Sequence, residues 1–195
     1  MRYAKLEGII LKKQNYKEAD QILTVWTRQS GKIRCLARGV RLNKSRLAYS
    51  LADLAQVEIQ LAGRNLPTLI GVSPVRQFRT LVQDLKKTAM AFYAAELMMK
   101  MTADEHPNPQ AFELLSDFLS RLDASDYSLK YHTLLENFSL PLLDCLGFKM
   151  PQDLDPASVL NMESAQAEEA HRQINQFIEY IIERNIRSEP FLISI

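Results

Sequence analysis

Short stretches of alternating apolar and polar residues fill the first eighty positions, and turn-forming residues separate them. Successive side chains of a strand point to opposite faces, so this two-residue period predicts strands. A Gln-Ser-Gly turn at 29–31 predicts a hairpin between two of them. The expected strands cover residues 6–16, 21–28, 32–39, 55–61 and 68–75. Five short strands without a long helix favour a small closed barrel, and the OB-fold is the commonest five-stranded form.

The period of the apolar residues changes near Thr80, where they begin to recur every three or four positions. This spacing predicts helices. Asn108 is a candidate helix N-cap with Pro109 as the first helical residue, and Gly147 is a candidate helix end. A last helix is expected over residues 164–187. The chain is therefore expected to be an α+β multidomain protein with an OB-fold barrel at 1–79 and an all-α helical domain at 80–195.

Charge divides the chain in the same place. Residues 1–80 hold 15 Lys and Arg against 5 Asp and Glu, whereas residues 81–195 hold 9 against 18. The net charge of +1 conceals this division. A basic half joined to an acidic half indicates two modules with different partners. We expect the basic barrel to bind nucleic-acid phosphates and the acidic helical domain to have a different partner.

The densest cationic stretch runs along the third expected strand and into the loop after it. A two-residue period places Lys32, Arg34 and Arg38 on one face of this strand and Cys35 and Ala37 on the other. No acidic residue lies between Gln21 and Ala52. Such a field attracts phosphate backbones, although a solvated surface is the alternative. The candidate DNA-binding cations are Arg28, Lys32, Arg34, Arg38, Arg41, Lys44 and Arg46.

Trp26 is the candidate stacking residue of this surface. It shares a strand face with Thr24 and Arg28. OB-folds commonly bind single strands through a charged groove and aromatic side chains on which bases stack. Ordinary core packing of the tryptophan is the alternative. No base-reading motif is present, so we expect binding that depends on phosphates, with little sequence preference and strong salt sensitivity.

The sequence offers no catalytic or metal-binding constellation. Its three histidines have no Cys, Asp or Glu at a familiar ligand or triad spacing, and its six glycines form no phosphate-binding loop. A nuclease would need a carboxylate cluster, and Glu18 and Asp20 are the one close acidic pair of the basic half. We expect no enzyme, cofactor or metal. Cys35 and Cys145 lie far apart, which suits a reducing, cytoplasmic setting, and neither a signal peptide nor a membrane span is expected.

Several segments together resemble the bacterial recombination mediator family RecO. In the basic half they are LEGIILK at 6–12, YKEADQILT at 16–24, GKIR at 31–34, ARGVR at 37–41, KSRL at 44–47, PTL at 67–69 and VRQFR at 75–79. In the acidic half they are NPQAFELL at 108–115 and LLDCLGF at 142–148. The resemblance covers roughly residues 3–150.

This resemblance implies an OB-fold followed by a helical domain. It also implies binding of single- and double-stranded DNA, annealing of complementary strands, and help in loading RecA onto coated single strands. The implied protein partners are RecR and the acidic C-terminal tail of single-stranded-DNA-binding protein, in the cytoplasm at the nucleoid. Many relatives carry a four-cysteine zinc site after the LGF segment, but residues 150–156 contain no cysteine, so we expect no zinc finger.

An acidic tail would need a basic site within the acidic helical domain. Lys86, Lys87 and Lys100 are the candidate partner-binding residues, and solvation of a helix face is the alternative reading of these lysines. A protein-interaction adaptor remains the alternative function. In that case the cations of the barrel would bind an acidic partner protein in place of nucleic acid.

Overall fold

The computed structural model describes residues 3–42, 45, 47–124, 131–150 and 164–188. The chain forms two compact units, one of Met1–Arg79 with Thr102–Phe112 and the other of Thr80–Met101 with Glu113–Ile195. The expected division at residue 80 differs in one segment, because Thr102–Phe112 returns to the first unit. We call the first unit the barrel unit and the second the helical unit.

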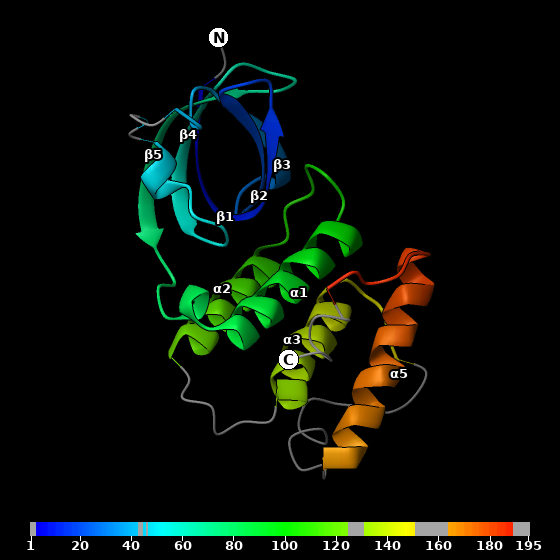
Figure 1. The fold of residues 1–195 in the computed structure, drawn as a ribbon. Coiled ribbons are helices and arrows are strands. Elements are labelled where there is room, and N and C mark those ends of the chain that lie inside the picture. Colours follow the sequence, from blue (N-terminus) through cyan, green and yellow to red (C-terminus); the bar gives the residue numbers. More distant parts are fainter. Residues whose placement is uncertain (1–2, 43–44, 46, 125–130, 151–163, 189–195) are drawn as a thin grey trace. The chain divides into compact units, whose positions relative to one another are not determined.

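The barrel unit is built on five strands that close in the order β1-β2-β3-β5-β4, which confirms the expected OB-fold barrel (Figure 1). Neighbouring strands are antiparallel except for β3 and β5, which pair in parallel only at Leu36 and Thr68. The strands are β1 (Tyr3–Tyr16), β2 (Asp20–Thr27), β3 (Gly31–Ala37), β4 (Gln56–Ala62) and β5 (Thr68–Arg76).

Alternation along the strands produces the interior of the barrel. Val25, Cys35, Ala37, Val57 and Ile59 are all buried in one hydrophobic cluster. On β4 the opposite face carries Glu58 and Gln60, as the two-residue period places them. Burial in this apolar surrounding raises the pKa of the Cys35 thiol to about 12, so Cys35 is a packing residue.

The return segment, Thr102–Phe112, is fixed to the barrel by backbone and side-chain contacts. The Glu105 amide donates to the carbonyl of Lys32 at 2.9 Å, and Asp104 forms an isolated parallel bridge with Lys32. The Lys32 ammonium donates to the Thr102 carbonyl at 2.6 Å. The first residues of β3 therefore have a partner on the edge that β5 leaves open.

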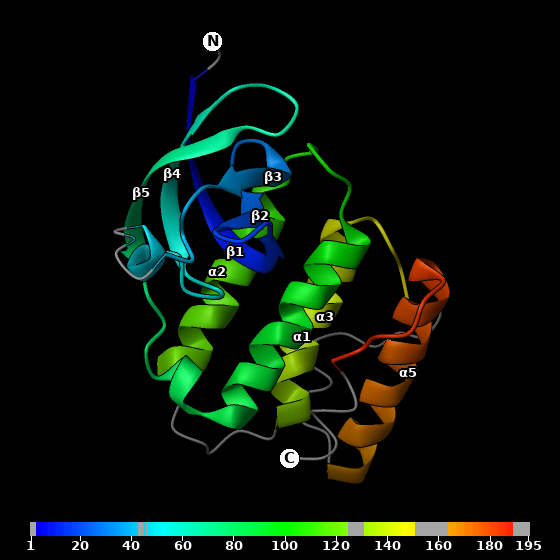
Figure 2. The same cartoon turned by 45° about the horizontal axis from the view of Figure 1, so that its top comes forward.

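The helical unit contains α1, α3, α5 and most of α2 (Figure 2). The Asn108 side chain accepts from the Ala111 amide at 3.0 Å, which confirms the expected cap of α2. Gly147 has a φ of 81° just after α3, as expected of a helix end. The helices are α1 (Leu85–Met101), α2 (Pro109–Ala124), α3 (Tyr131–Cys145) and α5 (Ser164–Ile182), and a 3-10 turn (Leu81–Gln83) precedes α1.

One carboxylate on α1 holds the chain that follows α5. Glu96 accepts hydrogen bonds from the amides of Arg187 and Ser188 at 2.9 and 2.8 Å, and it pairs with Lys100 at 2.6 Å. Burial alone would raise the pKa of Glu96, but these hydrogen bonds lower it below its ordinary value. Within the described ranges, none of the helices has the length and apolarity that crossing a bilayer requires.

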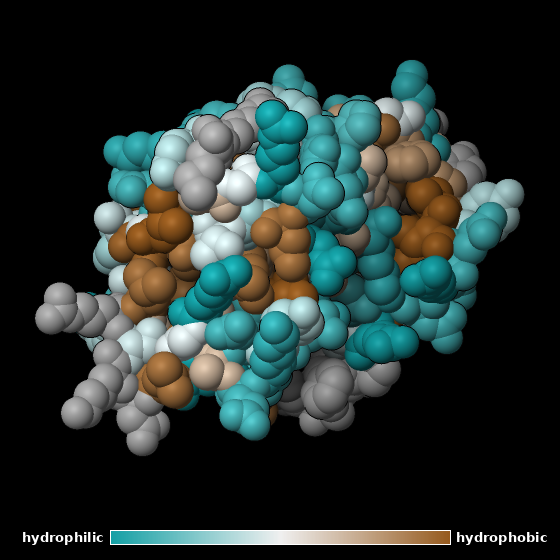
Figure 3. All heavy atoms as spheres, turned by 90° about the horizontal axis from the view of Figure 1, so that it is seen from above, coloured by the Kyte–Doolittle hydropathy of each residue, from teal (hydrophilic) through white to brown (hydrophobic). Residues whose placement is uncertain are grey.

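The surface alternates between polar and apolar areas. Figure 3 shows hydrophobic groups gathered in patches that hydrophilic side chains surround. On β5, Ile70 and Val75 are among the exposed large hydrophobic residues. Scattered apolar residues of this kind are normal on a folded protein and carry no functional argument alone.

Candidate nucleic-acid interface

Two arginines on the outer side of β3 and just after it form the centre of the candidate interface. Arg34 lies on the strand, opposite Thr24 of β2, and Arg38 begins the turn that follows β3. Both are exposed, and neither forms an ion pair with any described residue. Cys35 and Ala37 point into the barrel, as the two-residue period predicted. β3 therefore presents Arg34 outward from a rigid, packed base, and Arg38 follows in the turn next to it.

Arg41 extends this cationic surface toward the loop between β1 and β2. Its guanidinium donates to the carbonyls of Lys17 at 3.3 Å and Glu18 at 2.9 Å. Its amide donates to the Ala19 carbonyl, and this bond connects the loop after β3 to the loop between β1 and β2. Arg41 is nevertheless exposed. A guanidinium has five N–H donors, so those that these carbonyls do not occupy can still bind a phosphate. We call Arg34, Arg38 and Arg41 the arginine surface.

Arg28 and Lys32 have a different role from the one expected. The guanidinium of Arg28 pairs with Glu7 at 3.2 Å and lies 4.6 Å from the ring centre of Phe112. Lys32 pairs with Asp104 at 3.3 Å, and its side chain is only 11% exposed. Both cations hold the return segment to the barrel, so we remove them from the candidate phosphate contacts. Lys44 and Arg46, also expected at this surface, lie outside the described residues.

Trp26 is not available for stacking on a base. Its side chain is 0% exposed. It lies opposite Ile9 of β1 and Lys32 of β3, on the strand face that points away from the barrel interior. The sequence placed Trp26 on this outer face correctly, but the face is covered there. A ring without an accessible surface cannot receive a base, and the expectation of a stacking role was wrong.

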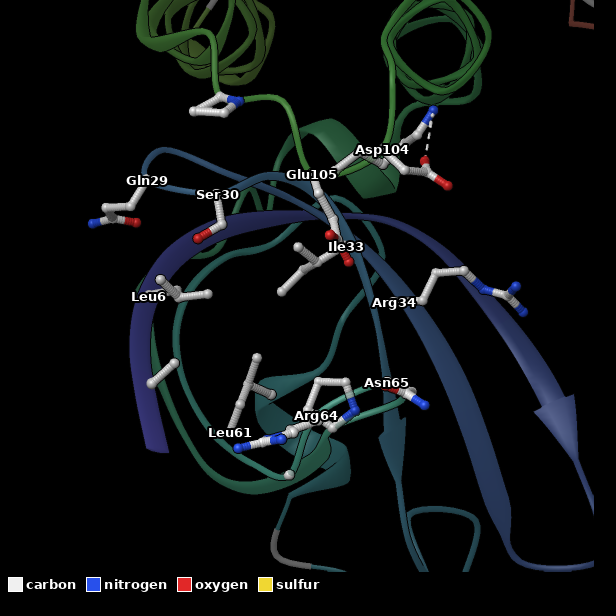
Figure 4. A pocket seen from close by; sticks show the side chains of 15 residues that line it. Leu6, Gln29, Ser30, Ile33, Arg34, Leu61, Arg64, Asn65, Asp104 and Glu105 are labelled. Carbon is white, nitrogen blue, oxygen red and sulfur yellow. Dashed lines mark ion pairs between the residues drawn. The ribbon is translucent and has the colours of Figure 1, made fainter. Parts of the chain in front are cut away.

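A pocket of about 790 Å³ opens beside Arg34 in the barrel unit. Its inner wall is apolar, with Leu6, Ile33 and Leu61 directed into the space, while Glu105 reaches over them (Figure 4). Arg64, in the turn between β4 and β5, also lines it. Neither Arg64 nor Glu105 was among the site residues expected from the sequence. No local pattern could reveal this pocket, because segments distant in sequence form it.

The three lysines proposed for partner binding do not form one basic site. Lys86 is exposed near the start of α1, whereas Lys87 is buried. Lys100 lies at the other end of α1, about 20 Å away along the helix axis, and is held by Glu96 and the Asn185 carbonyl. Only Lys86 of these three remains an exposed candidate.

A chain of buried polar groups crosses the helical unit from α1 to α5. The Tyr93 hydroxyl donates to Asn175 at 2.5 Å, and the Asn175 amide lies 2.9 Å from Nε2 of His171. Nδ1 of His171 lies 2.5 Å from Glu136, whose other oxygen has no hydrogen-bond partner among the described residues. These groups are at most 5% exposed, so a dissolved substrate cannot reach them. We assign the network a structural role.

Replacing Glu136 with glutamine is expected to flatten the dependence of stability on pH. Burial raises the pKa of Glu136 above its ordinary 4.5, and the hydrogen bond from His171 opposes this only partly. The unfolded chain therefore loses this proton at a lower pH than the folded chain does. The unfolding free energy should fall as pH rises from about 4.5, by at most about 1.4 kcal/mol per pH unit.

Urea unfolding of both proteins between pH 4.5 and 8, followed by far-UV circular dichroism, measures this difference. Relative to wild type, Glu136→Gln should gain stability as the pH rises. The matched control is Glu169→Gln, which removes an exposed carboxylate of the same unit. Parallel curves for wild type and Glu136→Gln would show that Glu136 does not titrate differently on folding.

Among the residues that the structure describes, no group of three or more His, Cys, Asp or Glu side chains could hold a metal ion. The segment after Gly147 that bears on the zinc expectation lies largely outside the described residues, at 151–163. The features of the barrel unit that could bind a ligand are its exposed guanidinium groups and the pocket beside Arg34. Exposed guanidinium groups of this kind can form charge-assisted hydrogen bonds to phosphates.

Two family models match the chain. Residues 1–78 match the family model described as "Recombination protein O N terminal", and residues 82–153 match "Recombination protein O C terminal". Both matches are to the same family, and they follow each other in the order of the barrel and the helices.

Individual relatives give the same result. A "DNA repair protein RecO" from Geobacter metallireducens is 32% identical over 155 residues, which cover 78% of this chain and 62% of that protein. Its counterpart from Dehalococcoides mccartyi is 36% identical over 146 residues, 74% of this chain and 56% of that protein. The chain spans about half the length of the curated relatives it matches. Because both family models match, one after the other along the chain, this chain belongs to the RecO family of DNA repair proteins.

Proposed function

We propose that this chain binds single- and double-stranded DNA through the arginine surface and anneals complementary strands. One observation carries the proposal: Arg34 and Arg38 are exposed on a rigid strand and its turn, without an ion pair to any described residue. Cations free of carboxylate partners release counterions when they meet phosphates, which favours binding. Membership of a DNA repair family supports the same role.

The proposed annealing needs no chemical step. Two strands repel each other through their phosphates, and guanidinium groups lower this repulsion. Contacts to phosphates leave most base edges free to pair. The product duplex presents the same phosphates, so it binds to the same surface. The protein then acts as a binding scaffold without hydrolysing a nucleotide.

The finer partnerships belong to the same proposal. We place the chain in the cytoplasm at the nucleoid, with RecR and the acidic tail of single-stranded-DNA-binding protein as partners. Acting with them, it would help RecA load onto coated single strands. The net negative charge of residues 81–195 would repel DNA from the helical unit and leave its surface for protein contacts. Lys86 is the exposed lysine at which to begin the search for the tail contact.

Replacing Arg34, Arg38 and Arg41 together with alanine is expected to weaken DNA binding and its dependence on salt. On a single strand each neutralised phosphate contributes about 0.7 to the slope of log affinity against log salt concentration, so the slope should become shallower by about 2. Fluorescence anisotropy of a labelled 20-nucleotide single strand, at several salt concentrations, measures both quantities.

The matched control removes the same charge elsewhere in the barrel unit, with Lys5, Arg76 and Arg79 replaced by glutamine. All three are exposed, and none belongs to the arginine surface. The control should keep the slope of the wild type. An unchanged slope for the arginine variant would move the DNA site elsewhere. No binding by the wild type at low salt would favour the adaptor that binds an acidic protein.

A further inference from the structure

The pocket beside Arg34 lies where the barrel is least tightly closed. β3 pairs with β5 only at Leu36, and with the return segment only at Lys32. Arg34 lies midway between Lys32 and Leu36. On this edge of β3 neither β5 nor the return segment pairs with it. The opening between them is the pocket of about 790 Å³. A ligand bound there therefore lies directly against β3, the strand that carries Arg34.

The pocket combines an apolar wall with charges of both signs at its edge. Leu6, Ile33 and Leu61 point into it in Figure 4. Arg34 and Arg64 supply positive charge, and Asn65 supplies an amide. These rim groups are exposed, and across the described chain Arg64 has no anionic partner.

Glu105 is the negative group that faces this wall. Its backbone φ is 58°, a left-handed conformation that is unfavourable for a residue with a side chain. The hydrogen bond from its amide to the Lys32 carbonyl holds it there. The carboxylate of Asp104 is paired with Lys32, but that of Glu105 has no cationic partner in the described part of the chain. Glu105 therefore offers two free acceptor oxygens above an apolar surface.

The mixture of charges limits the kind of occupant. Glu105 disfavours an acidic peptide, and Arg34 and Arg64 disfavour a basic one. A nucleotide of a DNA strand satisfies both signs, since its phosphate is anionic and its base can donate hydrogen bonds. An unstacked base also has flat faces that suit the apolar wall.

Guanine is the base that an ionised carboxylate recognises best. Its N1–H and N2–H donors lie side by side and can both reach one carboxylate. Adenine and cytosine each present an acceptor nitrogen beside their amino group, and thymine flanks its N3–H with two carbonyls. These acceptors would face the charge of Glu105 and repel it.

We propose that the pocket holds an unstacked guanine of the bound single strand, with Glu105 accepting from its N1–H and N2–H groups. Arg34 and Arg64 then lie beside the phosphates that flank this nucleotide. This proposal rests on the proposed DNA binding and adds a base preference to it. One guanine held at the edge leaves the other bases of the strand free to pair.

Three single strands of twelve nucleotides test the proposal: alternating dT-dG, alternating dT-dA, and alternating dT with deoxyinosine. Inosine keeps N1–H and lacks only the N2 amino group. Alternation places a guanine within reach in every register. At fixed salt, wild type should bind the guanine strand about tenfold more tightly than the inosine strand, the effect of one hydrogen bond to a charged group. The adenine strand should bind more weakly than both.

Glu105→Gln should lose the preference for guanine, with the guanine and inosine strands bound to within about twofold of each other, because its amide offers one acceptor and one donor and no longer two acceptor oxygens. The adenine strand should no longer be the weakest ligand, since an amide can pair with the donor and acceptor of adenine. The matched control is Glu18→Gln, which removes an exposed carboxylate near Arg41 and away from the pocket. It should keep the guanine preference. Equal, salt-sensitive binding of all strands by wild type would overturn the pocket proposal and leave DNA binding intact. Absence of binding to every strand would overturn both.

Discussion

Replacing Gly31 with alanine is expected to lower the unfolding free energy of the barrel unit by about 3 kcal/mol. Gly31 has a φ of 67°, a conformation that costs other residues free energy. An added Cβ would also lie 2.2 Å from the carbonyl oxygen of His106 and 2.4 Å from its carbon. Backbone atoms cannot turn aside as a flexible side chain can, so the return segment must move away from the barrel.

Urea unfolding followed by the fluorescence of Trp26, the single tryptophan, reports this loss for the barrel unit. The matched control is Gly39→Ala, in the same unit. Gly39 has a φ of 64°, but its added Cβ would meet only Leu42 at 3.5 Å. This control should lose about 1 kcal/mol from the backbone conformation alone. Equal losses for the two variants would show that His106 does not pack against Gly31.

Replacing Trp26 with alanine is expected to cost about 3–5 kcal/mol of unfolding free energy. The side chain is the largest of those that are fully buried, and removing it leaves a cavity. Trp26→Phe should cost less, about 1–2 kcal/mol, because the smaller ring still fills much of the space. Far-UV circular dichroism during urea unfolding measures both variants, since neither retains a tryptophan.

The phenylalanine variant also separates packing from stacking. A buried Trp26 has no contact with bases, so the folded Phe variant should bind single strands with the affinity and salt slope of wild type. A normally stable Phe variant that bound DNA several-fold more weakly would restore the stacking role.

Much of the barrel follows from local pattern. The alternation over Lys32–Ala37 correctly separated the inward Cys35 and Ala37 from the outward Arg34, because a strand has a strict period of two. The cap at Asn108 and the helix end near Gly147 were also predictable, since both depend on chemistry within a few residues.

What the sequence could not reveal depends on residues far apart along the chain. Alternation places Trp26 on the outer face of β2 but does not say that this face is covered. Likewise, Lys32 looks like a surface cation in the sequence, because Asp104, its partner in the fold, lies far along the chain. The pocket has the same origin, because Glu105 meets Leu6 and Leu61 only through the return of the chain after α1.

The barrel unit contains a segment, Thr102–Phe112, that follows the first helix of the helical unit in the sequence. This order determines when the barrel unit can finish folding during synthesis. All five strands have left the ribosome once Arg76 has cleared the exit tunnel, yet the barrel unit also needs residues up to Phe112. At 5–20 residues per second, the new chain waits about 2–7 s for this last piece. During that time the backbone beside Gly31 and the ammonium of Lys32 lack the partners that the return segment later supplies.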